Sequence, residues 1–248
     1  MSALMTELRI SHHGRTTDAA LFLPEGVSPC PAVILSHGYN SCMTDLYSAC
    51  EYFSSRGIAA AAFNFCGGGL RDKSGFPTTS MTLSTEKEDL LAVYDYVSGD
   101  ERVDRVFLFG SSQGGMISAL AAEVLQDKIG GLMLQFPALC IPDDWSRKYP
   151  VGSDIPDVVD MWGMNLGRGF ISEARSMDLS QAVGSYSGDV MIMHGDSDDI
   201  VPLRYSEWAA EAYKHARLEV FPGEGHGFSE QNNLRMNEMC LEFIRSRT

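Results

Sequence analysis

One serine of the chain lies in a sequence that could make it a nucleophile. Ser112 is the middle residue of a G-x-S-x-G pattern at 110–114, which follows the apolar run 106–109 and precedes a helical apolar spacing. Where a strand turns into a helix in this way, the glycines permit a sharp turn and the serine hydroxyl is presented at the helix N-terminus. Backbone amides there face any developing negative charge. We therefore predict that Ser112 is a nucleophile.

A serine hydroxyl is a poor nucleophile until a base removes its proton, so the chain should supply a histidine. His226 lies in the glycine-rich segment 223–227, shortly after the predicted strand 218–221. His215 ends a helical stretch rich in Glu and Lys, which is typical of a surface residue. We therefore predict that His226 is the base.

The base in turn needs a carboxylate that fixes its tautomer and stabilises the imidazolium. Segment 194–202 follows another apolar run and contains Asp196, Asp198 and Asp199. Asp196 suits a turn that binds backbone amides, and Asp199 suits a helix cap or a solvent-facing position. The residues favour Asp198 and leave its neighbours as alternatives. The resulting order is serine, aspartate, histidine, unlike the orders in two unrelated serine-protease folds.

Acyl transfer creates an oxyanion that needs preorganised N–H donors. The backbone amide of Gln113, which follows the nucleophile, is one expected donor. The loop after the apolar run 32–35 should supply the other, and the backbone amide of Tyr39 is its expected source. His37 in the same loop is expected to position that loop and not to act as a second base.

Apolar runs alternate with helical patterns along most of the chain. The run 32–35 lacks polar alternation and predicts a strand buried on both faces, and the runs 58–63 and 190–193 also predict buried strands. Further strands are predicted at 106–109, 132–134 and 218–221. Helical patterns separate them at 45–56, 86–97, 114–125, 205–214 and 231–245. The alternation predicts an α/β protein with a mostly parallel central sheet flanked by helices, preceded by a hairpin of 5–10 and 19–23. Ligands of such sheets bind beyond the carboxyl ends of the strands.

The segment 137–187 breaks this alternation with prolines, aspartates and large apolar side chains. A loop of that length inside a compact domain is usually functional. We expect residues 1–248 to form a single domain in which the segment 137–187 is inserted as a lid over the active site.

Composition and charge restrict the partners of the chain. Its 248 residues carry 33 Asp and Glu against 19 Lys and Arg, a net charge of −14, which disfavours a nucleic acid or an anionic membrane as partner. A small neutral substrate fits better. The N-terminus lacks a secretory pattern and no apolar stretch approaches the ~18 residues of a spanning helix, so a cytoplasmic location is expected.

Neither a metal nor an organic cofactor is expected. The six cysteines lack the spacing of a zinc site and are expected to be buried and reduced. The adjacent histidines His12 and His13 are expected to form a polar turn, because no carboxylate lies near them in the sequence.

Four short motifs together resemble the α/β-hydrolase superfamily, and the resemblance spans nearly the whole chain. They are His37-Gly38-Tyr39-Asn40, the elbow at 110–114, Gly195-Asp196-Ser197-Asp198 with Val201-Pro202, and Gly225-His226. The resemblance implies an α/β-hydrolase fold, and it assigns the acid to Asp198 and the base to His226.

Within the superfamily, the Ser-Gln-Gly of the elbow, the segment 136–138 and the moderate insertion are similar to those of bacterial feruloyl (cinnamoyl) esterases. That resemblance implies an aromatic acyl pocket formed by the insertion and lined by Asp143 or Asp144 and by Trp162. It is also compatible with a homodimer. Where these esterases carry a tyrosine that meets the phenolic hydroxyl, this chain has Phe170 and Ile171. Those two residues are therefore expected at an altered position of the pocket.

These observations predict a serine carboxylic-ester hydrolase that acts through a Ser-His-Asp triad and an acyl-enzyme on aromatic (feruloyl or cinnamoyl) or small acyl esters. Short-chain acyl or monoglyceride esterase, thioesterase and small peptidase activities are alternatives, because the triad serves any activated carbonyl. A non-catalytic ligand-binding protein on the same scaffold is the alternative from another class.

Overall fold

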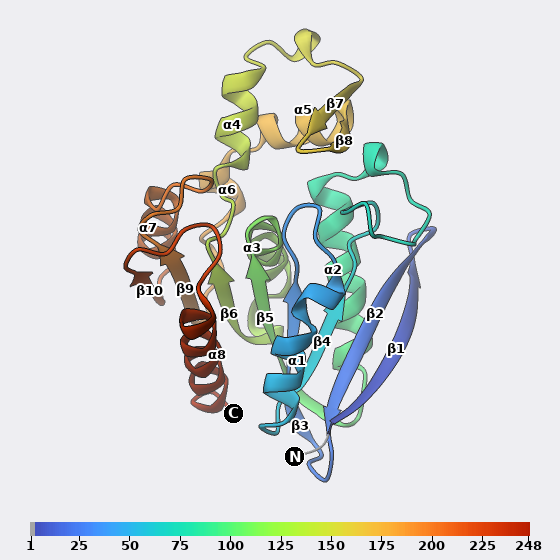
Figure 1. Cartoon of the computed structure of the whole chain (residues 1–248), viewed down its shortest axis with the longest axis vertical. Coiled ribbons are helices and arrows are strands. Elements are labelled where there is room, and N and C mark those ends of the chain that lie inside the picture. The colour runs from blue at the N-terminus through green and yellow to red at the C-terminus, as the bar shows by residue number, and fades with distance from the viewer. Residues whose placement is uncertain (1–2) are drawn as a thin grey trace.

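The computed structural model describes residues 3–248 and contains an eight-stranded sheet (Figure 1). The strands lie in the order β1-β2-β4-β3-β5-β6-β9-β10. β1 pairs with β2, and β2 with β4, in antiparallel register, whereas the strands from β4 to β10 are parallel. The strand bounds are β1 Ala3–His12, β2 Arg15–Pro24, β3 Cys30–Ser36, β4 Ala59–Phe63, β5 Val103–Ser111, β6 Ile129–Gln135, β9 Val190–Gly195 and β10 Ala216–Phe221.

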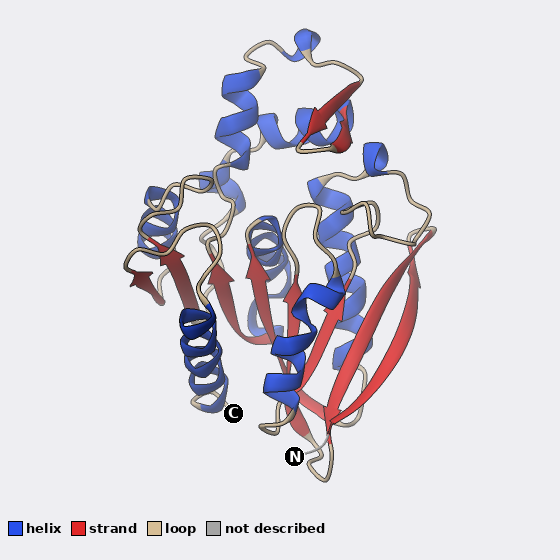
Figure 2. Cartoon of the chain, in the orientation of Figure 1, coloured by secondary structure: helices blue, strands red, loops and turns tan. Residues whose placement is uncertain are grey.

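Helices cover both faces of this sheet (Figure 2). One apolar cluster lies between the sheet and helices α1 and α8, and a second lies between the sheet and helices α2, α3 and α7. The central strands are therefore buried on both faces, which explains why their sequences lack polar alternation. The predicted fold class is confirmed. The helix bounds are α1 Tyr47–Ser54, α2 Leu83–Ser98, α3 Gln113–Leu125, α7 Arg204–Ala212 and α8 Glu230–Arg245.

The start of α2 differs most from the helix bounds that we predicted. The helix begins at Leu83, three residues before the expected start, because Thr82 caps it. The side-chain hydroxyl of Thr82 accepts the backbone N–H of Thr85, and the Thr85 hydroxyl accepts the N–H of Thr82. This reciprocal capping box satisfies two amides that would otherwise lack partners. The extra turn brings Glu86 well inside the helix.

The segment that we predicted as a lid lies beyond the carboxyl ends of the parallel strands (Figure 1). Two of its aromatic side chains, Trp145 and Phe170, are buried and join the same apolar cluster as α2 and α3. The segment is therefore packed onto the main body and contributes to its core. Its elements are α4 Ile141–Lys148, the 3-10 helix Gly152–Asp154, the antiparallel pair β7 Val158–Met161 and β8 Met164–Gly167, α5 Arg168–Ser176 and α6 Leu179–Ala182.

The N-terminal hairpin is confirmed, and its strands are longer than predicted, with His13 and Gly14 between them. All six cysteines are buried and free, as predicted. Within residues 3–248, every helix is too short or too polar to span a lipid bilayer.

Candidate active site

Ser112 lies in a sharp turn between β5 and α3, with backbone angles φ of 54° and ψ of −121°. Such angles are strained for a residue with a side chain, so the surrounding structure must impose them. The flanking glycines leave no room for side chains. A Cβ atom on Gly110 would lie 2.2 Å from the carbonyl oxygen of Gly114, and one on Gly114 would lie 2.4 Å from that of Ser36. The G-x-S-x-G spacing is therefore a packing requirement of this turn.

A continuous chain of hydrogen bonds joins Ser112, His226 and Asp198. The distance from Ser112 Oγ to His226 Nε2 is 2.9 Å, and that from His226 Nδ1 to Asp198 Oδ2 is 2.7 Å. His226 follows β10 and Asp198 follows β9, so the parallel sheet delivers all three residues to its carboxyl edge. These two distances are short enough for a proton to pass between Ser112 and His226 and for a carboxylate to orient the imidazole.

Backbone amides fix the orientation of Asp198. Its Oδ1 accepts the N–H groups of Ile200 and Val201, each at 2.9 Å, which leaves Oδ2 to face His226. The neighbouring aspartates lie elsewhere. Asp196 accepts the amide of Gly223 at 2.7 Å, as expected of a turn residue, and Asp199 is exposed.

A second imidazole, which the sequence did not single out, lies beside Asp198. His194 is fully buried, its Nε2 lies 3.3 Å from Asp198 Oδ2 and 2.9 Å from the carbonyl oxygen of Val201, and its Nδ1 lies 2.6 Å from the Ser206 hydroxyl. Burial lowers the pKa of His194, so the ring is neutral and donates to the carbonyl. It supports the loop that carries Asp198. The only sequence signal was its place at the end of β9.

The loop that contains Tyr39 lies directly against the nucleophile. A Cβ atom on Gly38 would lie 3.2 Å from Ser112 Cβ and 3.7 Å from its Oγ. Gln113 is the first residue of α3, where backbone amides have no partner within the helix. The structure thus places the loop of Tyr39 beside Ser112, and Gln113 at the start of α3 directly after it.

His37 holds this loop through both of its ring nitrogens. Nδ1 lies 2.8 Å from the carbonyl oxygen of Gly38, and the amide of Phe65 donates to Nε2 at 3.2 Å. Burial lowers the pKa of His37 to about 4, so the ring is neutral, with its proton on Nδ1. A neutral ring with a hydrogen bond at each nitrogen holds the loop in place. It has no free nitrogen with which to serve as a second base for Ser112.

A cavity of about 240 Å³ opens beside Ser112 and beneath the insertion. Its walls are mostly apolar and aromatic, with two carboxylates at the edge. A larger cavity of about 580 Å³ lies against β1 and β2. Ser112, His226 and Asp198 do not line it. The residues of the smaller cavity are Tyr39, Ser112, Gln113, Ala138, Cys140, Ile141, Asp144, Trp145, Met161, Trp162, Leu166, Phe170, Asp199, Ile200 and Val201.

Three of the five predicted pocket residues line this cavity, namely Asp144, Trp162 and Phe170. Asp143 does not, because consecutive residues of a helix point in different directions. Its carboxylate instead accepts the Tyr205 hydroxyl at 2.7 Å and lines a separate cavity. Ile171 is fully buried in the apolar core beneath α5 and also lies outside the cavity. The prediction that Asp143 and Ile171 line the pocket is therefore wrong.

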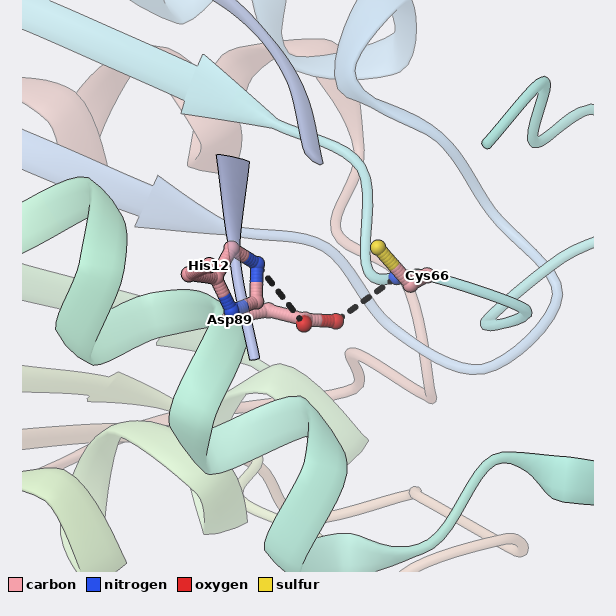
Figure 3. A group of neighbouring side chains, drawn as sticks. All are labelled: His12, Cys66 and Asp89. Carbon is pink, nitrogen blue, oxygen red and sulfur yellow. Dashed lines mark hydrogen bonds and ion pairs between the residues drawn. The ribbon is translucent and has the colours of Figure 1, made fainter. Parts of the chain in front are cut away.

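The ligand-type atoms of His12, Cys66 and Asp89 lie within 4.8 Å of one another (Figure 3). Such atoms could hold a metal ion, but Arg15 Nε lies 3.2 Å from Asp89 Oδ1 and already supplies a positive charge. Asp89 Oδ2 accepts the Cys66 amide at 2.7 Å, and His12 Nε2 lies 3.3 Å from Asp89 Oδ1. The group is a hydrogen-bonded junction between the hairpin and α2. Of the two histidines expected in a polar turn, His13 lies in the turn of the hairpin, whereas His12 is the last residue of β1 and contacts the carboxylate of Asp89, which is distant in the sequence.

Comparison with known proteins gives one family and several relatives. A family model described as serine aminopeptidase, S33 (Hydrolase_4), matches residues 27–168. A non-heme haloperoxidase of Rhodococcus erythropolis is 47% identical over 70 residues, which are 28% of this chain and 26% of that protein. The human mitochondrial palmitoyl-protein thioesterase ABHD10 is 26% identical over 205 residues, 77% of this chain and 64% of that protein. Both matches span less than two thirds of the curated relative.

Among solved structures, Est1E from Butyrivibrio proteoclasticus with ferulic acid bound is similar over almost its full length. The TM-score is 0.88 and the sequence identity 28%, with 97% of this chain and 98% of that chain covered. A second Est1E structure gives a TM-score of 0.83 at 26% identity, with 96% and 99% covered. The architecture of the sheet, the helices and the insertion is thus shared with a protein that binds ferulic acid.

Proposed function

The chain belongs to the family described as serine aminopeptidase, S33, and is an α/β-hydrolase, and from this premise we propose that it is a serine hydrolase of carboxylic esters. The observation that carries the proposal is the unbroken hydrogen-bond chain from Ser112 Oγ through His226 to Asp198 Oδ2, beside an apolar cavity. In the proposed mechanism these residues are the nucleophile, the base and the acid.

In the first half of the reaction, Ser112 Oγ attacks the ester carbonyl while His226 Nε2 takes up the hydroxyl proton. Asp198 stabilises the imidazolium, and the amides of Tyr39 and Gln113 donate to the oxyanion. When the tetrahedral intermediate collapses, the bond to the alcohol oxygen breaks and His226 returns its proton to that oxygen. The acid part of the ester is then bonded to Ser112.

In the second half, water takes the place of the alcohol. His226 removes a proton from the water as the water oxygen attacks the acyl carbonyl, and the same two amides hold the second oxyanion. Collapse breaks the bond to Ser112 Oγ, which regains its proton from His226. The carboxylic acid leaves, and no metal or organic cofactor takes part in these steps.

The proposed acyl group is a flat aromatic acid of the feruloyl or cinnamoyl type or a small acyl group. Trp145, Trp162 and Phe170 supply aromatic surface around the cavity, and the similar Est1E binds ferulic acid. We further propose that residues 1–248 form a single domain in which segment 137–187 serves as a lid that shields the acyl-enzyme. A thioesterase is the second candidate, because ABHD10 is similar over 77% of this chain.

Two experiments test these proposals. The first replaces the nucleophile: Ser112→Ala should abolish ester hydrolysis and labelling by a fluorophosphonate probe, while circular dichroism shows an intact fold. Full activity of this variant would exclude the triad. Failure of the probe to label folded wild-type protein would favour a non-catalytic ligand-binding protein.

The second experiment compares kcat/KM for p-nitrophenyl and methyl esters from acetate to decanoate, for ferulate and p-coumarate esters, and for matched thioesters. A preference for ferulate over acetate supports the aromatic assignment, and equal values would refute it. A preference for long-chain thioesters would favour the second candidate. Analytical ultracentrifugation of the same preparation tests whether the protein forms the homodimer with which the resemblance is compatible.

A further inference from the structure

Helix α2 carries two buried carboxyl groups one turn apart, and only one of them has a cationic partner. Asp89 pairs with Arg15, whereas Glu86, whose exposed fraction is 1%, forms no ion pair with any lysine or arginine among residues 3–248. Burial of an unpaired carboxylate is costly, so such a group is usually kept neutral. The proposed hydrolytic mechanism assigns no role to Glu86.

The contacts of Glu86 lie at the back of the oxyanion site. The Gln113 side-chain amide Nε2 lies 2.9 Å from Oε1 and 2.7 Å from Oε2 of Glu86. Gln113 itself is 3% exposed and supplies the proposed oxyanion donor that follows the nucleophile. Glu86 therefore holds the side chain of the residue whose backbone amide must point at the substrate.

Glu86 also lies against the loop that supports the second proposed donor. A Cβ atom on Gly68 would lie 3.3 Å from Glu86 Oε1, and the Gly68 carbonyl oxygen accepts the backbone amide of Asn40 at 3.1 Å. Asn40 directly follows Tyr39. One buried carboxyl thus binds the side chain of one proposed donor residue and lies near the support of the other, from an element that carries none of the reacting groups.

The surroundings of Glu86 favour the uncharged acid. Burial raises the pKa of Glu86 well above its ordinary range, the nearby carboxyls of Asp89 and Glu173 act in the same direction, and the hydrogen bond from Gln113 opposes them. An ionised Glu86 would also raise the pKa of the Tyr39 hydroxyl. A neutral acid can accept both N–H groups of the Gln113 side-chain amide, one at its carbonyl oxygen and one at its hydroxyl oxygen.

We propose that Glu86 is a positioning residue that, as a neutral acid, fixes Gln113 and thereby the oxyanion donors, and that its ionisation in alkaline solution lowers turnover. The inference rests on the proposed hydrolytic function. An ionised Glu86 would place a negative charge behind the site where the substrate oxygen becomes negative, and charge of the same sign in a buried site raises the energy of that state.

The test measures kcat and KM for a p-nitrophenyl ester from pH 6 to 10.5 in wild type, Glu86→Gln and Glu86→Leu. Wild type should lose activity on the alkaline side through kcat, with KM little changed. Glu86→Gln, which keeps the shape but cannot ionise, should retain kcat near neutral pH and lose the alkaline fall. Glu86→Leu should lower kcat by about tenfold at all pH values, less than the ~100-fold or more expected for complete removal of a donor.

Asp89→Asn is the matched control, since it removes the other buried carboxyl of α2 without touching Gln113. Burial raises the pKa of Asp89 to about 7, so its titration falls in a different range. This variant should keep the alkaline fall. Circular dichroism at each pH separates loss of turnover from unfolding, and an infrared band of a protonated carboxylic acid at pH 8 should disappear in Glu86→Gln.

Two outcomes overturn the inference. One is an alkaline fall in Glu86→Gln equal to that of wild type, and the other is an unchanged kcat in folded Glu86→Leu. Both can occur while Ser112→Ala remains inactive, in which case the hydrolytic mechanism stands and only the role of Glu86 fails. If Ser112→Ala is active, the proposed function itself is excluded.

Discussion

The buried imidazole of His37 predicts how the stability of the protein depends on pH. His37 is 2% exposed and accepts the Phe65 amide at Nε2, so protonation of that nitrogen would set two N–H groups against each other. Burial is the main cause that lowers the pKa from 6.5 to about 4, while the hydrogen bond to Gly38 opposes it. Acid should therefore destabilise the loop that carries Tyr39.

The magnitude follows from the two pKa values. Between pH 6.5 and about 4 the unfolded chain holds a proton on His37 that the folded protein lacks, so the free energy of unfolding decreases as the pH falls. A difference of about 2.5 units, at ~1.4 kcal/mol per unit, corresponds to about 3 kcal/mol lost once the pH is below about 4. That is a large share of the ~5–15 kcal/mol that stabilises a typical domain.

The assay is urea unfolding at half-unit steps from pH 3.5 to 7.5. His37→Asn keeps an N–H donor for the Gly38 carbonyl and cannot be protonated, so its stability should vary with pH by about 3 kcal/mol less than that of wild type. His215→Asn, at an exposed position, is the control and should follow wild type. Parallel curves for wild type and His37→Asn would refute the reasoning.

Three further variants test the site and the insertion. Asp198→Asn should lower kcat by about 10⁴-fold with KM little changed, because His226 loses the carboxylate 2.7 Å from its Nδ1. Ester-hydrolysis kinetics measure this loss, and a decrease of only about tenfold would contradict the assignment. Gly38→Ala places a methyl group 3.2 Å from Ser112 Cβ and should slow fluorophosphonate labelling about tenfold or more. Labelling at the wild-type rate would show that the loop moves to accommodate the methyl group. Phe170→Ala removes a ring that is 1% exposed and should cost about 3–5 kcal/mol in urea unfolding. A loss below 1 kcal/mol would mean that the insertion is not part of the core.

Much of the fold could be predicted because its signals are local. Apolar runs of three to six residues mark the central strands, and the helical patterns between them leave a parallel sheet as the simple solution. The capping box at Thr82 was overlooked, although Thr82 and Thr85 stand in the sequence at the required spacing. A local signal of this kind could have placed the start of α2 correctly.

The pocket was harder to predict because it depends on contacts between distant segments. Asp143 and Asp144 are adjacent in the sequence, and only the orientation of α4 turns one toward the cavity and the other toward Tyr205. His12 and Asp89 are far apart in the chain, and the hairpin brings them within 3.3 Å. No motif links such partners.

The sequence by itself determined the elbow around Ser112 and the placing of the Asp198 and His226 segments after strands, since glycine spacing and apolar runs are properties of neighbouring residues. Only the tertiary structure decided which aspartate bonds His226, which insertion residues reach the cavity, and that Glu86 lies behind Gln113. The physical reason is that burial, charge and hydrogen-bond partners arise where separate segments pack together. Those quantities set the protonation and orientation of each group, and no stretch of sequence contains them.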